Sequence, residues 1–365
     1  MKHGIVSRIT DSMFNYQGWP TITKDENGTL YAASSGHRLG HICPFGKNLL
    51  YVSRDDGETW SVPRIINDSV LDDRDAGLCY LGNGKILLSW FNLSREFYWN
   101  GNMAASICNA HAQPYGAELA EGMMKSWKLL PDDMVKPGCY VRLSRDYGEH
   151  WEEPINLPVS SPHGPTLLQN GKVLYFGKEN ASASTKDGNN NIAVYESADD
   201  GKTWERLTTV TLPDIVGPND CHEPHAVQLP SGRILAAIRA HGPNMPHGFS
   251  ILLCHSDDNG KTWSIPRPTG FDGSPPHLFV HSSGAVVLTY GRRIKPFAEI
   301  ARVSYDGGET WSEEIVLDDR SADSDLGYPS TTELSDGSLI TVYYQKFPGD
   351  RKCSILYTKW ELPTK

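Results

Sequence analysis

The chain has 365 residues, a net charge of −10 and 10% aromatic residues, with 34 Gly and 24 Pro. No block of basic residues occurs, which argues against a nucleic-acid partner and against binding to an anionic membrane surface. Length alone would suggest two or three domains, but the turn-rich composition suits many short strands in a single all-β domain.

The N-terminal residues 1–14 contain no apolar core, so no signal peptide is predicted, and no segment approaches the length of a membrane span. The seven cysteines are scattered and form no CxxC pair, so a zinc knuckle is not expected. Buried free thiols in a reducing cytoplasm are the simplest interpretation. We therefore expect a cytoplasmic protein that needs no metal or other cofactor.

An octapeptide of the pattern S-x-D-x-G-x-T-W occurs five times, with His150 replacing the Thr in the second copy. In each copy the Gly can supply a positive φ, the Asp and Ser can bind turn amides, and the Trp can pack between neighbouring sheets. Such self-similarity indicates a repeat fold such as a propeller. The copies occupy residues 53–60, 144–151, 197–204, 256–263 and 304–311.

A second motif alternates with the octapeptides and consists of a short strand, a Gly-containing turn and a more apolar strand. Its six copies supply the first two strands of each blade, and each octapeptide joins the third strand to the fourth. The last unit has no octapeptide, so residues 3–9 are free to supply its missing strand and close the ring. The copies occupy residues 19–34, 75–91, 163–178, 223–239, 275–292 and 328–345.

The sequence thus predicts one all-β domain over residues 1–365, a six-bladed β-propeller of four-stranded antiparallel blades. The second blade carries a long insertion, residues 92–138, which exceeds ordinary loop lengths. Residues 117–130 within it are predicted to form a short amphipathic helix. Such an insertion can be a lid or a contact between the subunits of a homo-oligomer.

Chain direction brings the starts of the first strands and the ends of the second strands together at one end of the axis. The octapeptides lie at the opposite end. Ionisable groups are dense at these positions, and although each alone could form a structural salt bridge, their convergence predicts a functional site. The strand starts are Gln17–Trp19, Asp73–Asp75, His163, His222–His225, His277 and Tyr328, and the strand ends are His37–Arg38, Phe91–Asn92, Lys178–Glu179, Arg239, Arg292–Arg293 and Gln345–Lys346.

The octapeptides and the six-unit layout resemble the sialidase superfamily, whose propellers carry Asp-box or BNR repeats. The resemblance covers nearly the whole chain. It implies an exo-acting glycoside hydrolase that takes a non-reducing-end sugar, with acidic sugars among the candidates, from an oligosaccharide or glycoside. Members of the superfamily hold a substrate carboxylate with three Arg and use a Tyr nucleophile, a Glu partner and an Asp acid/base.

Carried over residue by residue, the resemblance assigns three parts of this machinery. Tyr328 matches the nucleophile at the start of the last blade, and Glu223 matches its partner. Arg239 and Arg292 match two of the Arg that clamp the substrate, with Arg293 as an alternative to Arg292. The aromatic residues of the insertion, 97–99, could stack on sugar rings.

The first two blades depart from the family pattern. Residues 18–20 read Gly-Trp-Pro where members usually have Arg-Ile-Pro, so the first clamp Arg is missing and Arg74 could replace it. The first blade also lacks the acid/base Asp, a role that Asp73 or Asp75 could take, and we expect Asp75 to be catalytic. Arg38 matches an Arg that often follows the second strand, and it is expected to bind substrate.

His163, His225 and His277 are further candidates for substrate binding or for acid–base chemistry, since their ordinary pKa lies near neutrality. A zinc site is not expected from them because they come from different blades without ligand spacing. Two other functions stay open: a polysaccharide lyase acting on uronic acids, in which His or Tyr would remove the proton, and a glycan-binding propeller without activity.

Overall fold

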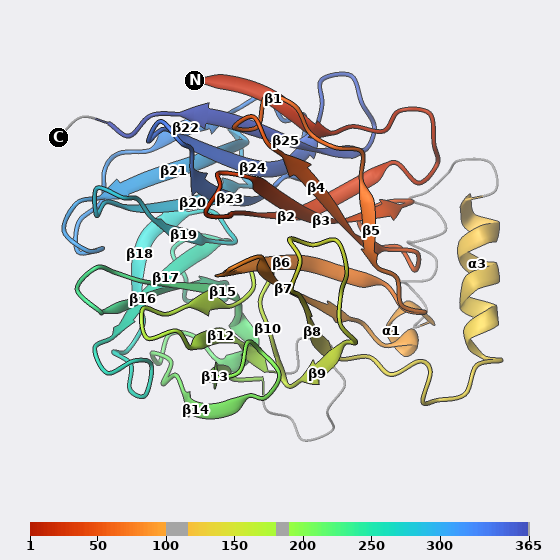
Figure 1. Cartoon of the computed structure of the whole chain (residues 1–365), viewed down its shortest axis with the longest axis horizontal. Helices are drawn as coiled ribbons and strands as arrows, with labels where there is room; N and C mark the ends of the chain where they lie inside the picture. Colours follow the sequence, from red (N-terminus) through yellow and green to blue (C-terminus); the bar gives the residue numbers. More distant parts are fainter. Residues whose placement is uncertain (100–115, 180–189, 364–365) are drawn as a thin grey trace.

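The computed structural model describes residues 1–99, 116–179 and 190–363, and it confirms the predicted six-bladed propeller. Figure 1 shows the sheets arranged around a common centre, with the first strand of each blade innermost. The innermost strands of neighbouring blades contact one another around the ring. The site at the axis is therefore built by strands that lie far apart in the sequence.

Blades 1 and 2 are regular four-stranded antiparallel sheets, whereas the inner strand of blade 3 is broken into two short pieces, β10 and β11. Blade 1 contains β2 (Tyr16–Lys24), β3 (Leu30–Arg38), β4 (Lys47–Ser53) and β5 (Arg64–Asn67). Blade 2 contains β6 (Asp73–Gly82), β7 (Lys85–Asn92), β8 (Cys139–Ser144) and β9 (Ile155–Leu157). Blade 3 contains β10 (Val159–Ser160), β11 (Thr166–Leu167), β12 (Val173–Glu179), β13 (Ile192–Ser197) and β14 (Glu205–Thr209).

Blades 4, 5 and 6 are also four-stranded antiparallel sheets, and a one-turn helix, η1 (Pro218–Asp220), precedes blade 4. Blade 4 contains β15 (Cys221–Gln228), β16 (Ile234–Ala240), β17 (Ser250–Ser256) and β18 (Arg267–Asp272). Blade 5 contains β19 (His277–Val280), β20 (Val286–Arg292), β21 (Ala298–Ser304) and β22 (Ile315–Asp318). Blade 6 contains β23 (Gly327–Glu333), β24 (Leu339–Lys346), β25 (Cys353–Trp360) and β1 (Lys2–Ser7).

The N-terminal strand closes the ring as predicted. Strand β1 pairs antiparallel with β25, from Lys2 opposite Lys359 to Ser7 opposite Ile355. In Figure 1 the red N-terminal strand lies beside the blue β25. Because β1 pairs along the outer edge of β25, this edge is covered. The first and last strands of the propeller thus belong to one sheet.

The octapeptides form tight turns held by their own Ser and Asp. In the first copy Gly57 N donates to Ser53 Oγ at 2.9 Å, and Thr59 N and Oγ1 donate to the Asp55 carboxylate at 2.9 and 2.6 Å. These bonds lower the Asp55 pKa to about 2, with the Thr59 hydroxyl as the main cause. The Ser, Asp and Thr side chains of the motif are thus used within the turn, which fits a structural role.

The Trp residues of the octapeptides pack against the preceding sheet. Trp204 is half-buried against the apolar cluster between blades 2 and 3, which includes Leu87, Val141 and Tyr175. The centroids of the Trp204 and Tyr175 rings lie 5.7 Å apart, and Trp204 Nε1 donates to Gly201 O at 2.9 Å. This packing ties the end of one blade to the face of the preceding one.

The described part of the insertion contains α1 (Arg95–Trp99) and α3 (Gly116–Trp127), while residues 100–115 lie outside the described residues. Tyr98 and Trp127 are fully buried in a small apolar cluster under these helices. The Tyr98 hydroxyl donates to Asp72 Oδ2 at 2.7 Å. The expectation that Tyr98 stacks on a sugar is therefore wrong, because its ring is part of the interior. Neither of these helices is long and apolar enough to cross a membrane.

If the octapeptides serve the fold alone, Trp204→Ala should lower the free energy of unfolding by about 3 kcal/mol, as for other large-to-small substitutions at packed aromatic residues. The variant that remains folded should keep the turnover of the parent protein. Chemical denaturation and activity measurements on the same preparation test this. A large loss of turnover with unchanged stability would contradict the structural role.

Candidate functional site

Four of the six innermost strands begin with the same irregularity, a β-bulge whose first residue has a left-handed backbone. These residues are Trp19, Asp75, Glu223 and Tyr328, with φ of 55°, 55°, 46° and 50°. The pairing register shifts across each of them. A bulge re-aims the side chain, and a left-handed φ in a bulky residue is uncommon and strained. Such strain is typical of functional sites, and here it recurs in four blades.

Tyr328, Glu223 and Arg239 form one hydrogen-bonded chain. The Tyr328 hydroxyl donates to Glu223 Oε1 at 2.5 Å, and Arg239 Nη1 donates to Glu223 Oε2 at 2.5 Å. The Tyr328 side chain comes from blade 6 and the other two from blade 4, so only the closed ring brings them together. These three residues were predicted from the sequence to share one pocket, and in the structure they are in contact.

The protonation states of Glu223 and Tyr328 are set by the groups around them. Burial works to raise the Glu223 pKa, but Arg239 and the Tyr328 hydroxyl outweigh it, so that the pKa of this carboxyl is lowered. Burial, with the negative charges of Glu223 and Asp75, raises the Tyr328 pKa well above its ordinary value. The resting pair is therefore an ionised carboxylate that accepts a hydrogen bond from a neutral phenol.

Two neighbouring arginines lie at the end of β20 in blade 5. Arg293, and not Arg292, lies beside the hydrogen-bonded pair Tyr328 and Glu223. The Arg293 guanidinium carbon is 5.5 Å from the centroid of the Tyr328 ring, and Arg293 Nη2 donates to the Tyr344 hydroxyl at 3.0 Å. Arg292 instead donates to Pro296 O at 2.7 Å and to Glu314 Oε2 at 2.5 Å. The sequence left open whether Arg292 or Arg293 is the second clamp residue, and the position of Arg293 fits that role.

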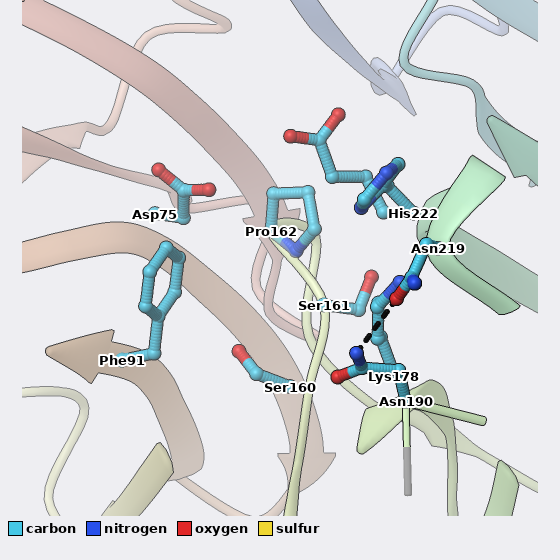
Figure 2. Close-up of a pocket in the computed structure, with 10 residues that line it drawn as sticks. Asp75, Phe91, Ser160, Ser161, Pro162, Lys178, Asn190, Asn219 and His222 are labelled. Atoms are coloured by element: carbon cyan, nitrogen blue, oxygen red, sulfur yellow. Dashed lines mark hydrogen bonds between the residues drawn. The ribbon is translucent and has the colours of Figure 1, made fainter. Parts of the chain in front are cut away.

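Asp75 and Glu223 line the same cavity, which has a volume of about 270 Å³ (Figure 2). Asp75 and Phe91 lie on one side of it, and Lys178 and His222 lie on the other. The walls also include a short polar stretch from the break in the inner strand of blade 3. The lining residues are Asp75, Phe91, Ser160, Ser161, Pro162, Lys178, Asn190, Asn219, His222 and Glu223.

The Asp75 carboxyl is buried, and its Oδ1 has no hydrogen-bond partner among the residues that the structure describes. Burial raises the Asp75 pKa to about 7; Arg74 opposes this effect and the charge of Glu223 adds to it. Two carboxyl groups that share a cavity and have pKa values pushed apart are suited to the roles of acid and base. Asp75 is then the protonated member near neutrality, and Glu223 is the ionised one.

The neighbouring Asp73 lies outside this cavity. Its carboxylate accepts hydrogen bonds from Ser69 N at 2.8 Å, Ser69 Oγ at 2.7 Å and Asn92 Nδ2 at 2.7 Å. Burial raises its pKa to about 6, against the effect of these donors. Asp73 therefore fixes the loop before β6, and Asp75 is the better candidate for the acid.

Arg38 and Arg74 pack against the ring of Trp19, on the side of blade 1. Both donate to the buried Asp72 carboxylate, and their guanidinium carbons lie 4.8 and 4.4 Å from the centroid of the Trp19 ring. Arg38 is fully buried, and neither Arg is part of the cavity lining. Their contact with substrate stays a prediction, and their position favours support of Trp19 and of the neighbouring Asp75.

His163, His225 and His277 form a buried layer below the cavity. The rings of His225 and His277 stack with centroids 4.5 Å apart, and their Nδ1 atoms accept hydrogen bonds from Leu278 N and Thr331 N in the next blade. Burial lowers the pKa of all three, to about 3 for His225. Their contact with substrate stays a prediction, and the bonds of His225 and His277 favour a role in joining blades. Among the described residues no group of three His, Cys, Asp or Glu side chains is arranged to hold a metal.

The sequence analysis gave no role to several residues of the cavity. Lys178, His222 and Phe91 were recognised as strand ends or starts at the mouth, but nothing distinguished them from their neighbours. Ser160 and Ser161, at and just after the end of the short strand β10, and Asn219 in the one-turn helix η1 carry no motif. The signal that could have found the bulge residues is a Pro directly after the strand start, as in Trp19-Pro20, Glu223-Pro224 and Tyr328-Pro329.

The fold and the Tyr–Glu–Arg chain define a propeller of the class in which BNR repeats occur. A family profile described as "BNR repeat-like domain" matches residues 124–341, more than half of the chain. The chain belongs to this family, and its predicted membership of the sialidase superfamily is thereby confirmed.

A curated relative is a xyloglucanase from Paenibacillus sp, 24% identical over 256 residues. The matched region is 63% of this chain and only 23% of the xyloglucanase, so the chain spans about a quarter of that protein. The likeness thus links one part of a larger enzyme to most of this propeller.

Solved structures with the same fold include a protein of unknown function from Dyadobacter fermentans, with a TM-score of 0.76 and 23% identity over 99% of this chain and 98% of that one. A sialidase from Streptococcus pneumoniae has a TM-score of 0.69 and 16% identity, over 98% of this chain and 70% of that one. An α-L-arabinanase from Penicillium chrysogenum has a TM-score of 0.60 and 13% identity, over 99% and 98%. At these identities the likeness establishes the fold, and the relatives named for an activity bear the names of glycoside hydrolases.

The raised Asp75 pKa makes a prediction about stability. The native protein holds this proton up to about pH 7, whereas the unfolded chain releases it near pH 4, so stability falls as pH rises between these values. Asp75→Asn should remove that decline and stabilise the protein at pH 8 by up to about 4 kcal/mol. Denaturation curves from pH 4 to 8 test this, with exposed Asp133→Asn as the control. A parallel pH dependence in wild type and Asp75→Asn would contradict the assignment.

Proposed function

We propose that this protein is an exo-acting glycoside hydrolase that takes a non-reducing-end sugar into the cavity between Asp75 and Glu223. The observation that carries this proposal is the direct hydrogen bond between Tyr328 and Glu223 beside a cavity that also holds a protonated carboxyl, Asp75. A nucleophile, its base and an acid are the groups that hydrolysis with retention requires.

In the first step the Tyr328 oxygen bonds to the anomeric carbon as the glycosidic C–O bond breaks. The phenol proton passes to Glu223, and the leaving oxygen takes the proton of Asp75. In the second step water attacks the same carbon and gives a proton to Asp75, while the Tyr328 oxygen leaves and recovers its proton from Glu223. Each residue ends in its starting state, and the sugar keeps its anomeric configuration.

Two arginines favour the first step. The raised Tyr328 pKa means that the phenol does not ionise in the resting protein, so its proton must move as the new bond forms. Arg239 and Arg293 both lower that pKa and lie where negative charge develops on the oxygen. Fixed positive charge in a water-poor site stabilises such a transition state without reorganisation.

Two alternatives use the same cavity. In an inverting reaction Glu223 would activate a water while Asp75 acts as the acid, and Tyr328 would only orient Glu223. A lyase would need a base that reaches the proton next to a uronic-acid carboxylate. The buried position and low pKa of His163, His225 and His277 speak against these histidines as that base.

Replacing the nucleophile separates retention from inversion. Tyr328→Phe should reduce kcat on aryl glycosides by about a thousandfold or more if the phenol oxygen forms the covalent bond. A screen of aryl glycosides and acidic oligosaccharides first identifies a substrate. The control is Tyr147→Phe, an exposed Tyr in an octapeptide on the opposite face. A loss of only about tenfold would contradict the nucleophile role, and an unsaturated product absorbing in the ultraviolet would identify a lyase.

The acid role of Asp75 gives a pH profile. A general acid must be protonated, so kcat/KM should fall about tenfold per pH unit above about pH 7, the pKa of Asp75 in the free protein. Asp75→Asn should abolish this fall, and it should slow glycosides with poor leaving groups far more than activated aryl glycosides. An equal effect on both substrates would contradict the role of Asp75 as the acid.

A further inference from the structure

The wall of the cavity opposite Asp75 contains a buried lysine with an unusual set of partners. Lys178, at the end of β12, is 7% exposed, and its Nζ donates to Pro218 O at 2.7 Å and to Cys221 O at 2.6 Å. An ammonium group has three N–H donors, and the described residues accept from two of them. Both acceptors are neutral carbonyl oxygens, which orient the charge without neutralising it.

No carboxylate oxygen among the described residues forms a hydrogen bond or an ion pair with Lys178. The two carboxylates whose charges act on it are committed elsewhere: Asp220 Oδ2 accepts from Gly217 N at 2.8 Å, and Glu223 binds Tyr328 and Arg239. Burial accordingly lowers the Lys178 pKa to about 8, because these distant charges compensate only in part. Buried charges in proteins are usually paired, so a cation of this kind at a cavity wall is a place for an anion.

The surroundings of Lys178 suit an anionic group and offer it further donors. Of the described residues that line the cavity, Lys178 is the only Lys or Arg. On the same wall Asn190 Nδ2 donates to Asn219 Oδ1 at 2.7 Å, which leaves the amide hydrogens of the exposed Asn219 available for a ligand (Figure 2). His222 adds no competing charge near neutrality, because burial and the nearby Lys178 lower its pKa to about 4.

We propose that Lys178 and Asn219 form an anion subsite that binds a carboxylate or sulfate group carried by the sugar in this cavity. The subsite deepens the proposed hydrolase function and rests on it for the presence of a sugar. Arg239 and Arg293 each donate to a side chain within the site, Glu223 and the Tyr344 hydroxyl, whereas Lys178 donates only to carbonyl oxygens among the described residues. The substrate class is therefore an acidic sugar whose charged group lies on the wall opposite Asp75.

The test is direct binding of free sugars, which needs no turnover. Glucuronate, galacturonate and glucose 6-sulfate are titrated against the full chain by calorimetry or ligand-detected NMR, with glucose as the neutral probe. Wild type should bind at least one acid in preference to glucose. Lys178→Met should weaken that binding about tenfold or more, as expected for loss of a charged hydrogen bond. Lys178→Arg should restore part of it, and binding of glucose should not change.

Lys172→Met is the matched control, since Lys172 is more exposed, precedes the same strand and pairs with Glu196 outside the cavity. If Lys178→Met fails to fold because two carbonyls lose their donor, Asn219→Ala takes its place and should weaken acid binding several-fold. Unchanged acid binding in the folded Lys178 or Asn219 variants, or no preference for any acid in wild type, would overturn the subsite. A preference for the uronates or for the sulfate tells which group is bound.

The failures of the two proposals are distinguishable. Acid binding that depends on Lys178, in a protein that hydrolyses no glycoside in the screen, would support the subsite and refute the hydrolase. Hydrolysis of neutral glycosides that Lys178→Met leaves unchanged, without preference for acids, would refute the subsite and leave the hydrolase intact.

Discussion

The site depends on a backbone constraint, the left-handed bulge at the start of four innermost strands. Trp19, Asp75, Glu223 and Tyr328 each occupy it, at a cost of about 1–3 kcal/mol per residue. The strands on either side hold this conformation, because neighbouring blades are joined just below the bulges. Ile22 N donates to Ser330 Oγ, and Leu278 N donates to His225 Nδ1. These buried polar contacts between blades thus help to orient the side chains of the bulge residues.

The bulges bring together groups whose charges oppose one another. Asp75 stays protonated because it is buried and faces the negative charge of Glu223, while Glu223 stays ionised because Arg239 binds it. Moving either carboxyl by one residue along its strand would change its burial and its partner. Asp73 illustrates this, since two residues earlier on the same strand it is bonded to Ser69 and Asn92 and serves the loop.

The side of blade 1 is built differently from the family pattern, and this shapes what the cavity can recognise. Gly18 stands where the resemblance implies an Arg. The ring of the next residue, Trp19, is flanked by Arg38 and Arg74, which share the Asp72 carboxylate. Both guanidinium groups thereby have partners within the protein. Under the proposed subsite, Lys178 on the opposite wall recognises the anionic group instead, so that the acidic sugar would lie across the cavity between Lys178 and Asp75.

The sequence alone determined the six blades, the closure by β1 and the meeting of Tyr328, Glu223 and Arg239, because turn chemistry is local and chain direction fixes which strand ends share a face. It could not choose between Arg292 and Arg293, since successive residues of a strand point to opposite faces and only packing decides which face meets Tyr328. The burial of the three histidines and the different environments of Asp75 and Asp73 also required the tertiary structure. Burial and bulge position arise from contacts between blades, and no local pattern in the sequence records them.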